Sequence, residues 1–307
     1  MILRLLTFLA SASLAAAQGA DPAPAAASQP AAAPVSFKDG DTVVLLGDVF
    51  FERDYNYGHL ETALTAAAGK NLRIRNLGWS GDTPRCESRS YFGPPAEGMD
   101  RLKKQLGEIK PNIVIACYGA VDAFKGEAGV KDFLASYGKL LDMVKAACGA
   151  PVILMSPPAV SADVKKWPSL EGHAAKLALY RDAIRSLASE RGAGFADLLG
   201  AMKDVKLATV NGVSLTEADY RETAPAFAKS LGLPLDAAAA SSVQNNPALT
   251  KKILEKNRLF FYRWRPQNET YLFGFRKHEQ GNNGVEIPQF DPLIAEKEKE
   301  IAGLLKR

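Results

Sequence analysis

The stretch Thr42–Gly47, with the sequence TVVLLG, decides the fold because it is an unbroken apolar run that ends at a glycine. Such a run is typical of a strand buried on both faces of a parallel sheet. Further strands are expected at 72–77, 112–118, 151–155 and 194–198, with helical periodicity between them at 60–69, 99–109, 130–148 and 171–191. Strands that alternate with helices at this spacing predict an α/β fold, a parallel sheet with helices on both faces.

The composition of the chain argues against several classes of function. The chain has 307 residues, of which 47% are apolar, and its net charge of +4 is too small to argue for nucleic acid. Three cysteines without a C-x-x-C pair and three histidines without an H-E-x-x-H pair are unlike known zinc sites, so we expect no metal and no cofactor. Cys86 and Cys148 are left as a possible disulfide, since sequence cannot fix their distance.

The N-terminus indicates export. Residues 1–17 have the basic start, apolar centre and small-residue end of a signal peptide, and residues 18–34 form an Ala/Pro-rich linker. We therefore expect a periplasmic or extracellular protein. No later segment approaches the length of about 20 apolar residues that a membrane span needs. The main domain is expected at 35–245, followed by a C-terminal extension at 246–307.

Distinctive residues follow the expected strands, at the edge where parallel sheets bind ligands. The four blocks are GDVFFER at 47–53, NLGWSGD at 76–82, YGAVD at 118–122 and NGVSLT at 211–216. In this order they resemble the SGNH or GDSL hydrolases. The resemblance implies a flavodoxin-like three-layer sandwich with five parallel strands, and esterase chemistry.

The same resemblance argues against that chemistry in this chain. The family patterns are Gly-Asp-Ser, a glycine, Gly-x-Asn-Asp and Asp-x-x-His. By this resemblance the nucleophile position is Val49, the oxyanion-hole Asn position is Val121, the base position is Ser214 and the orienting acid is Asn211. Among the family's catalytic positions only Gly78 keeps its residue type. Valine offers neither a nucleophile nor an oxyanion donor. We expect no catalytic residue of the family kind.

Other groups at the strand ends have both a catalytic and a structural interpretation. Ser80 is a weak candidate nucleophile. Asp48 and Asp122 lie at the ends of strands expected to be neighbours and could form an acid–base pair, although capping of the following turns is the favoured interpretation. Ser214 is interpreted as the start of a capping box that ends at Glu217.

The C-terminal extension is basic and aromatic between residues 251 and 265, and its final helix is amphipathic. It is expected to form an ordered arm with aromatic anchors, with the final helix docked on the body. Arginine beside aromatic rings suits stacking on sugars and pairing with anionic groups. We expect Arg263, Arg265 and Asn268 to reach the strand ends and to contribute to a ligand site there.

The sequence therefore predicts a non-catalytic binder of carbohydrate or another small-molecule envelope ligand. Its predicted ligand-binding residues are Asp48, Glu52, Arg53, Gly78, Trp79, Asp82, Arg263, Arg265 and Asn268. The alternative is a divergent hydrolase of carbohydrate or acyl esters that uses the carboxylates of Asp48, Glu52, Asp82 or Asp122. A third hypothesis is a module recruited through the aromatic tail. Nucleic acid is not an expected partner, and the oligomeric state is open.

Overall fold

A five-stranded parallel sheet forms the centre of the domain. The computed structural model describes residues 36–91, 93–161, 170–233, 246–279, 281 and 283–305, so the predicted signal peptide and linker lie outside the described residues. The strands are β1 (Thr42–Gly47), β2 (Arg73–Gly78), β3 (Ile113–Cys117), β4 (Val152–Met155) and β5 (Gly194–Ala196). Their order, β2-β1-β3-β4-β5, is that of flavodoxin-like folds, which confirms the predicted fold class.

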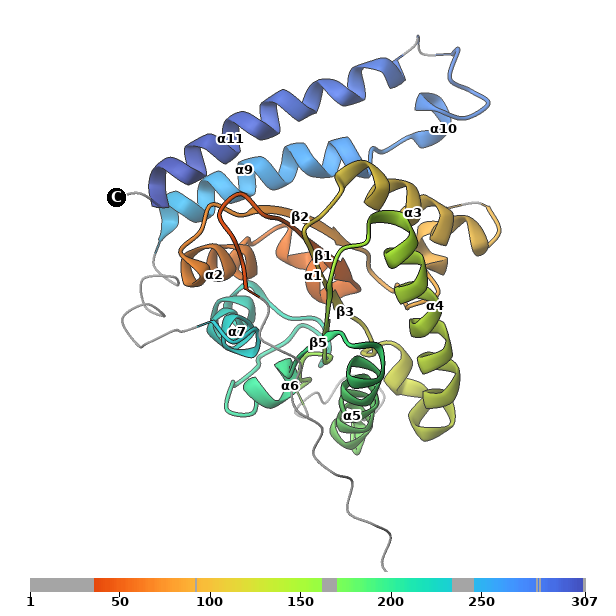
Figure 1. Ribbon diagram of the computed structural model, residues 1–307, viewed down its shortest axis with the longest axis vertical. Helices are drawn as coiled ribbons and strands as arrows, with labels where there is room; N and C mark the ends of the chain where they lie inside the picture. Colours follow the sequence, from red (N-terminus) through yellow and green to blue (C-terminus); the bar gives the residue numbers. More distant parts are fainter. Residues whose placement is uncertain are drawn as a thin grey trace, which may run out of the picture. The chain divides into compact units, whose positions relative to one another are not determined.

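Helices cover both faces of the sheet (Figure 1). One face packs against α2 (His59–Ala68), α6 (Leu198–Ala201) and α7 (Glu217–Ser230), and the other against α3 (Ala96–Ile109), α4 (Val130–Cys148) and α5 (His173–Arg191). Short α1 (Val49–Asp54) follows β1 directly. The C-terminal extension contains α9 (Pro247–Trp264), α10 (Glu269–Leu272) and α11 (Phe290–Leu305), and 3₁₀ turns occupy Glu87–Arg89, Asp122–Gly129 and Asn283–Gln289.

The apolar run of β1 is buried because it serves both layers. Val43 and Leu45 pack into the cluster with α2 and α7, whereas Val44 and Leu46 pack into the cluster with α3, α4 and α5. All four side chains are fully buried. Successive side chains of a strand point to opposite faces, so an unbroken apolar run is required here. Full burial of each side chain contributes about 1.5–3 kcal/mol.

The predicted capping box at Ser214 is wrong by two residues. Helix α7 has Thr216 as its N-cap: Asp219 N–H donates to Thr216 Oγ1 at 3.2 Å, and Thr216 N–H donates to Asp219 Oδ2 at 2.7 Å. Ser214 lies before the helix because its N–H donates to Asn211 Oδ1 at 2.8 Å in a side-chain-stabilised turn. Helix α7 therefore starts after Thr216, which forms the capping box with Asp219.

The C-terminal extension is anchored to the domain by charged groups. Lys256 of α9 forms a buried ion pair with Glu61 of α2 at 2.5 Å and also donates to the backbone oxygen of Ile74 at 3.1 Å. Arg75 of β2 pairs with Glu298 of α11. Helix α11 lies beside α9 (Figure 1). The final helix thus docks through α9 and the β2 edge of the sheet.

Candidate functional site at the carboxyl ends of the strands

Asp48 stands at the end of β1 and caps α1. Its Oδ1 accepts a hydrogen bond from Phe50 N–H at 3.1 Å, as the capping interpretation predicts. The side chain is buried, and this burial raises its pKa from 3.8 to about 7, with a smaller contribution from the negative charges of Asp82 and Asp122. Asp48 is therefore a carboxyl group that titrates near neutral pH.

Asp82 belongs to a buried hydrogen-bonded cluster behind the end of β2. Arg89 Nε lies 2.7 Å from Asp82 Oδ2, and Tyr118 OH lies 3.0 Å from the same oxygen. Arg89 also donates to the backbone oxygen of Leu77 at 2.8 Å. Burial raises the pKa of Asp82, and the charge of Arg89 opposes that rise. Sequence reasoning missed Arg89, because no local pattern distinguishes a fully buried arginine from a solvated one.

Asp122 pairs with an arginine and does not cap a turn. Arg85 Nη1 lies 3.0 Å from Asp122 Oδ1, and Arg85 Nη2 lies 2.5 Å from Asp132 Oδ2. The following 3₁₀ turn has Val121 as its N-cap residue, without a side-chain hydrogen bond, so the capping interpretation of Asp122 is wrong. Asp48, Asp82 and Asp122 follow β1, β2 and β3, and each has a partner among the described residues. Asp82 and Asp122 pair with arginines, whereas Asp48 accepts a hydrogen bond from a backbone N–H.

Val49 and Ser214 meet at one small cavity. Both line a space of about 10 Å³ together with Asp48, Arg53 and Tyr220. This is the volume needed for about one water molecule. Within the described ranges, no hydroxyl or thiol side chain hydrogen-bonds to a histidine.

Gly78 is required by close packing. A Cβ at this position would lie 2.3 Å from the backbone nitrogen of Glu52, which is closer than any non-bonded contact allows. Its N–H donates to Asn76 Oδ1 at 2.9 Å. The backbone amide of Gly78 is therefore engaged by a side chain of its own strand.

A polar–aromatic cluster forms where α1, the end of β2 and the C-terminal extension meet; it comprises Glu52, Trp79, Ser80, Tyr91 and Arg265. The guanidinium carbon of Arg265 lies 3.6 Å from the centre of the Trp79 ring, and Arg265 also forms an ion pair with Glu52. Ser80 N–H donates to Glu52 Oε2 at 3.0 Å. Tyr91 contacts Trp79 edge-on, with ring centres 5.4 Å apart, and is 41% exposed.

The other two predicted extension residues make contacts within the extension. Arg263 pairs with Asp291 of α11 at 3.0 Å and does not reach the strand ends. Asn268 precedes α10 in a left-handed conformation, with φ of 60°, and its backbone oxygen accepts from Tyr271 N–H at 2.8 Å. Arg263 lies within α9 and turns toward α11, whereas Arg265 is the C-cap residue just beyond the helix and turns toward Glu52, so the two arginines of this stretch meet different elements. Ligand binding by Arg263 and Asn268 stays a prediction.

The described residues offer neither a metal site nor a disulfide. None of their histidine, cysteine, aspartate and glutamate side chains forms a group of three placed to hold a metal ion. The described helices include none with the length and apolarity to cross a membrane. Cys86 and Cys148 are unpaired, and burial raises the pKa of the Cys86 thiol to about 12.

Comparison with solved structures gives matches to several enzymes. Axe2, an acetylxylan esterase from Geobacillus stearothermophilus, is 17% identical, with 65% of this chain and 98% of that chain covered and a TM-score of 0.49. The M. smegmatis aryl esterase is 18% identical, with 63% and 99% covered and a TM-score of 0.49. BT4096, a gut microbial diltiazem-metabolizing enzyme, is 16% identical, with 65% and 48% covered and a TM-score of 0.50.

Comparison with curated protein sequences gives no match. The family model of the GDSL-like Lipase/Acylhydrolase family matches residues 39–235, which include the whole sheet and the four strand-end blocks. This match covers more than half of the chain and agrees with the observed strand order. The chain therefore belongs to the GDSL-like lipase/acylhydrolase family.

Proposed function

We propose that this family member is an exported, non-catalytic protein that binds carbohydrate through the polar–aromatic cluster at the end of β2. The proposal of export is supported by the signal-like residues 1–17 of the sequence. The proposal of lost catalysis is supported by the residues that line the ends of the strands. The proposal of carbohydrate binding is supported by the groups that surround Trp79.

Loss of hydrolysis is supported by what lines the end of β1. Acyl transfer needs a hydroxyl or thiol beside a base, with donors aimed at the developing oxyanion. Val49 and Ser214 line a cavity with room for about one water molecule. The N–H of Gly78 is directed to Asn76. Loss of such machinery costs on the order of a million-fold in turnover.

Ser80 gives little support to a replacement nucleophile. Its hydroxyl contacts the Glu52 carboxylate, which also receives the Ser80 N–H and the Arg265 guanidinium. The oxygens of the Glu52 carboxylate are thus already held by an arginine and by the Ser80 backbone, in a fixed hydrogen-bond arrangement. This arrangement suits recognition better than proton abstraction.

Carbohydrate binding is supported most by the sharing of Glu52 between Ser80 and Arg265 beside two aromatic rings. Ser80 is exposed, Tyr91 is 41% exposed, and Glu52 and Arg265 are partly exposed, so these groups are accessible to a ligand. A sugar ring would stack on Tyr91, and its hydroxyl groups would exchange hydrogen bonds with Ser80 and Glu52. The Trp79 ring is already covered by Arg265 and serves as the rigid floor.

Binding is tested by a glycan array followed by calorimetry with the best glycan. Tyr91→Ala should weaken its affinity by about tenfold or more, because a stacked aromatic ring is lost. Phe124→Ala is the matched control: Phe124 is 53% exposed and stacks on His173, away from the polar–aromatic cluster. Equal affinities of the wild type and Tyr91→Ala would refute this site.

A second candidate function, ester hydrolysis with a carboxyl group as general acid, is favoured by the pKa of Asp48, which burial raises to about 7. Its test is specific. If the purified protein turns over p-nitrophenyl acetate and Asp48→Asn abolishes this turnover while Asp204→Asn does not, the divergent hydrolase is the correct function. Asp204 is exposed and lies outside the strand-end site.

A further inference from the structure

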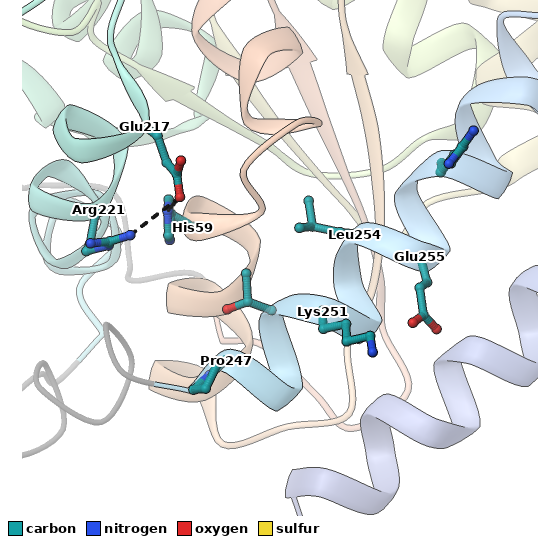
Figure 2. Close-up of a pocket in the computed structure, with 9 residues that line it drawn as sticks. His59, Glu217, Arg221, Pro247, Lys251, Leu254 and Glu255 are labelled. Carbon is teal, nitrogen blue, oxygen red and sulfur yellow. Dashed lines mark hydrogen bonds and ion pairs between the residues drawn. The ribbon is translucent and has the colours of Figure 1, made fainter.

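A second cavity lies away from the strand ends, between the starts of α2 and α7 and the length of α9. Its volume is about 780 Å³, whereas the cavities at the ends of β1 and β2 measure about 10, 20 and 30 Å³. Volumes of several hundred Å³ are typical of ligand sites. Figure 2 shows His59, Glu217 and Arg221 on one side of this groove, and Lys251 and Leu254 of α9 on the other.

The groove has an excess of positive charge. Among its described lining residues, Arg221, Lys251 and Arg258 are cationic, and the two acidic ones, Glu217 and Glu255, are already paired. Glu217 lies 3.4 Å from Arg221 Nη2. Glu255 pairs with Lys252 at 3.1 Å and with Lys297 of α11 at 3.0 Å, so its charge is balanced outside the groove. An anionic ligand would therefore meet a net positive charge.

The cations on α9 form a row. Lys251, Leu254 and Arg258 recur at intervals of three and four residues, which places them on one face of the helix. Lys251 and Arg258 are both exposed and stand about 10 Å apart along the helix axis. Lys251 has no ion-pair partner among the residues that the structure describes. Two cations at this spacing fit an extended ligand with repeated acidic groups better than a single compact anion.

His59 supplies a separate indication of a ligand. It is 8% exposed, and its Nε2 has no hydrogen-bond partner in the described part of the chain; the Glu217 carboxylate lies 3.8 Å away, beyond hydrogen-bond distance. Burial lowers the pKa of this imidazole and Arg221 lowers it further, against the opposing charge of Glu217, so the neutral form of the ring is favoured. A neutral ring nitrogen without a partner costs free energy unless a ligand group, such as a hydroxyl, completes it.

From these observations we infer that the groove between α2, α7 and α9 binds an acidic oligosaccharide, with Lys251 and Arg258 pairing to carboxylate groups and His59 hydrogen-bonding to a hydroxyl. The groove carries no phenylalanine, tyrosine or tryptophan among its described lining residues, and such rings are the platforms on which single-stranded nucleic acids stack. Carboxylate and hydroxyl chemistry therefore fits the lining better than bases do. This site is independent of the polar–aromatic cluster proposed above.

The test uses calorimetry of the full-length protein with tetragalacturonate, a neutral galactan oligomer, sodium sulfate and oligo(dT). Tetragalacturonate should bind, and the double variant K251E/R258E should weaken binding by about tenfold or more, because two charge-assisted contacts become repulsive. The matched control K103E/K104E makes the same change of charge on exposed residues of α3. The control should bind like the wild type, and thermal unfolding verifies that both variants are folded.

Several results would overturn this site. One is that the wild type does not bind tetragalacturonate, and others are that it binds oligo(dT) more tightly or the neutral oligomer equally well. An equal loss of tetragalacturonate affinity in K251E/R258E and K103E/K104E would overturn it too. Binding of sulfate with the same affinity as tetragalacturonate would also overturn it, because it would show only a general attraction of anions. Tyr91→Ala should leave tetragalacturonate binding unchanged, which separates this groove from the polar–aromatic cluster.

Discussion

Replacing Asp48 by asparagine should remove a large pH dependence of stability. Burial raises the pKa of Asp48 from 3.8 to about 7. Each pH unit of that rise corresponds to about 1.36 kcal/mol, so ionising this carboxyl group in the folded protein costs about 4 kcal/mol. The folded state binds more protons between the two values. The stability that protonated Asp48 provides is therefore complete below about pH 4 and is lost as the pH rises through about 7.

Urea unfolding between pH 4 and 8 measures this effect as the difference in free energy of unfolding between the wild type and Asp48→Asn. Asparagine keeps the oxygen that accepts from Phe50 N–H but cannot ionise. The difference should fall by about 4 kcal/mol across the range, in favour of the variant at high pH.

A second buried carboxyl group offers a comparison. Burial also raises the pKa of Asp54 to about 7, so Asp54→Asn should show a slope of the same sign. A pH-independent difference between the wild type and Asp48→Asn would refute the buried, near-neutral titration of this carboxyl group.

Three further results are expected. Lys256→Met should lower the free energy of unfolding in urea by about 3–5 kcal/mol, because it leaves the buried Glu61 carboxylate without a partner. Adding Glu61→Leu should recover most of this loss. If the losses of the two single variants simply add in the double variant, the buried pair is contradicted. Gly78→Ala should destabilise by about 1–3 kcal/mol or more, because its Cβ would meet backbone atoms at 2.3 Å, and unchanged thermal stability would disprove that packing. Arg265→Ala should increase acrylamide quenching of Trp79 fluorescence, and identical quenching would mean that the guanidinium does not cover the ring.

The fold can be predicted well because the apolar run of β1 is compatible with few architectures. Four consecutive residues of Thr42–Gly47 pack alternately into two cores, and only a strand between two helical layers satisfies that pattern. Helix ends are harder to predict. Ser-x-x-Glu at Ser214 matches the capping-box pattern, but the side chain of Asn211 takes the Ser214 N–H and shifts the helix start to Thr216.

The strand-end residues can be located by sequence, but their partners cannot. Arg89 and Arg85 lie on a loop between β2 and α3, and nothing in the local pattern tells which carboxylate each will meet. Likewise, the separation of Arg265 from Arg263 depends on where α9 ends. The groove along α9 combines segments from distant parts of the sequence, so no linear motif could predict it.

The proposed loss of esterase chemistry is tested most directly by the steady-state turnover of p-nitrophenyl acetate by the purified wild-type protein, beside the variant V49S/S214H and an active family esterase. We predict wild-type turnover below about a thousandth of that of the active enzyme, because the proposed loss of nucleophile and base would cost on the order of a million-fold. Wild-type turnover above that level would contradict the proposal that the end of β1 no longer supports hydrolysis.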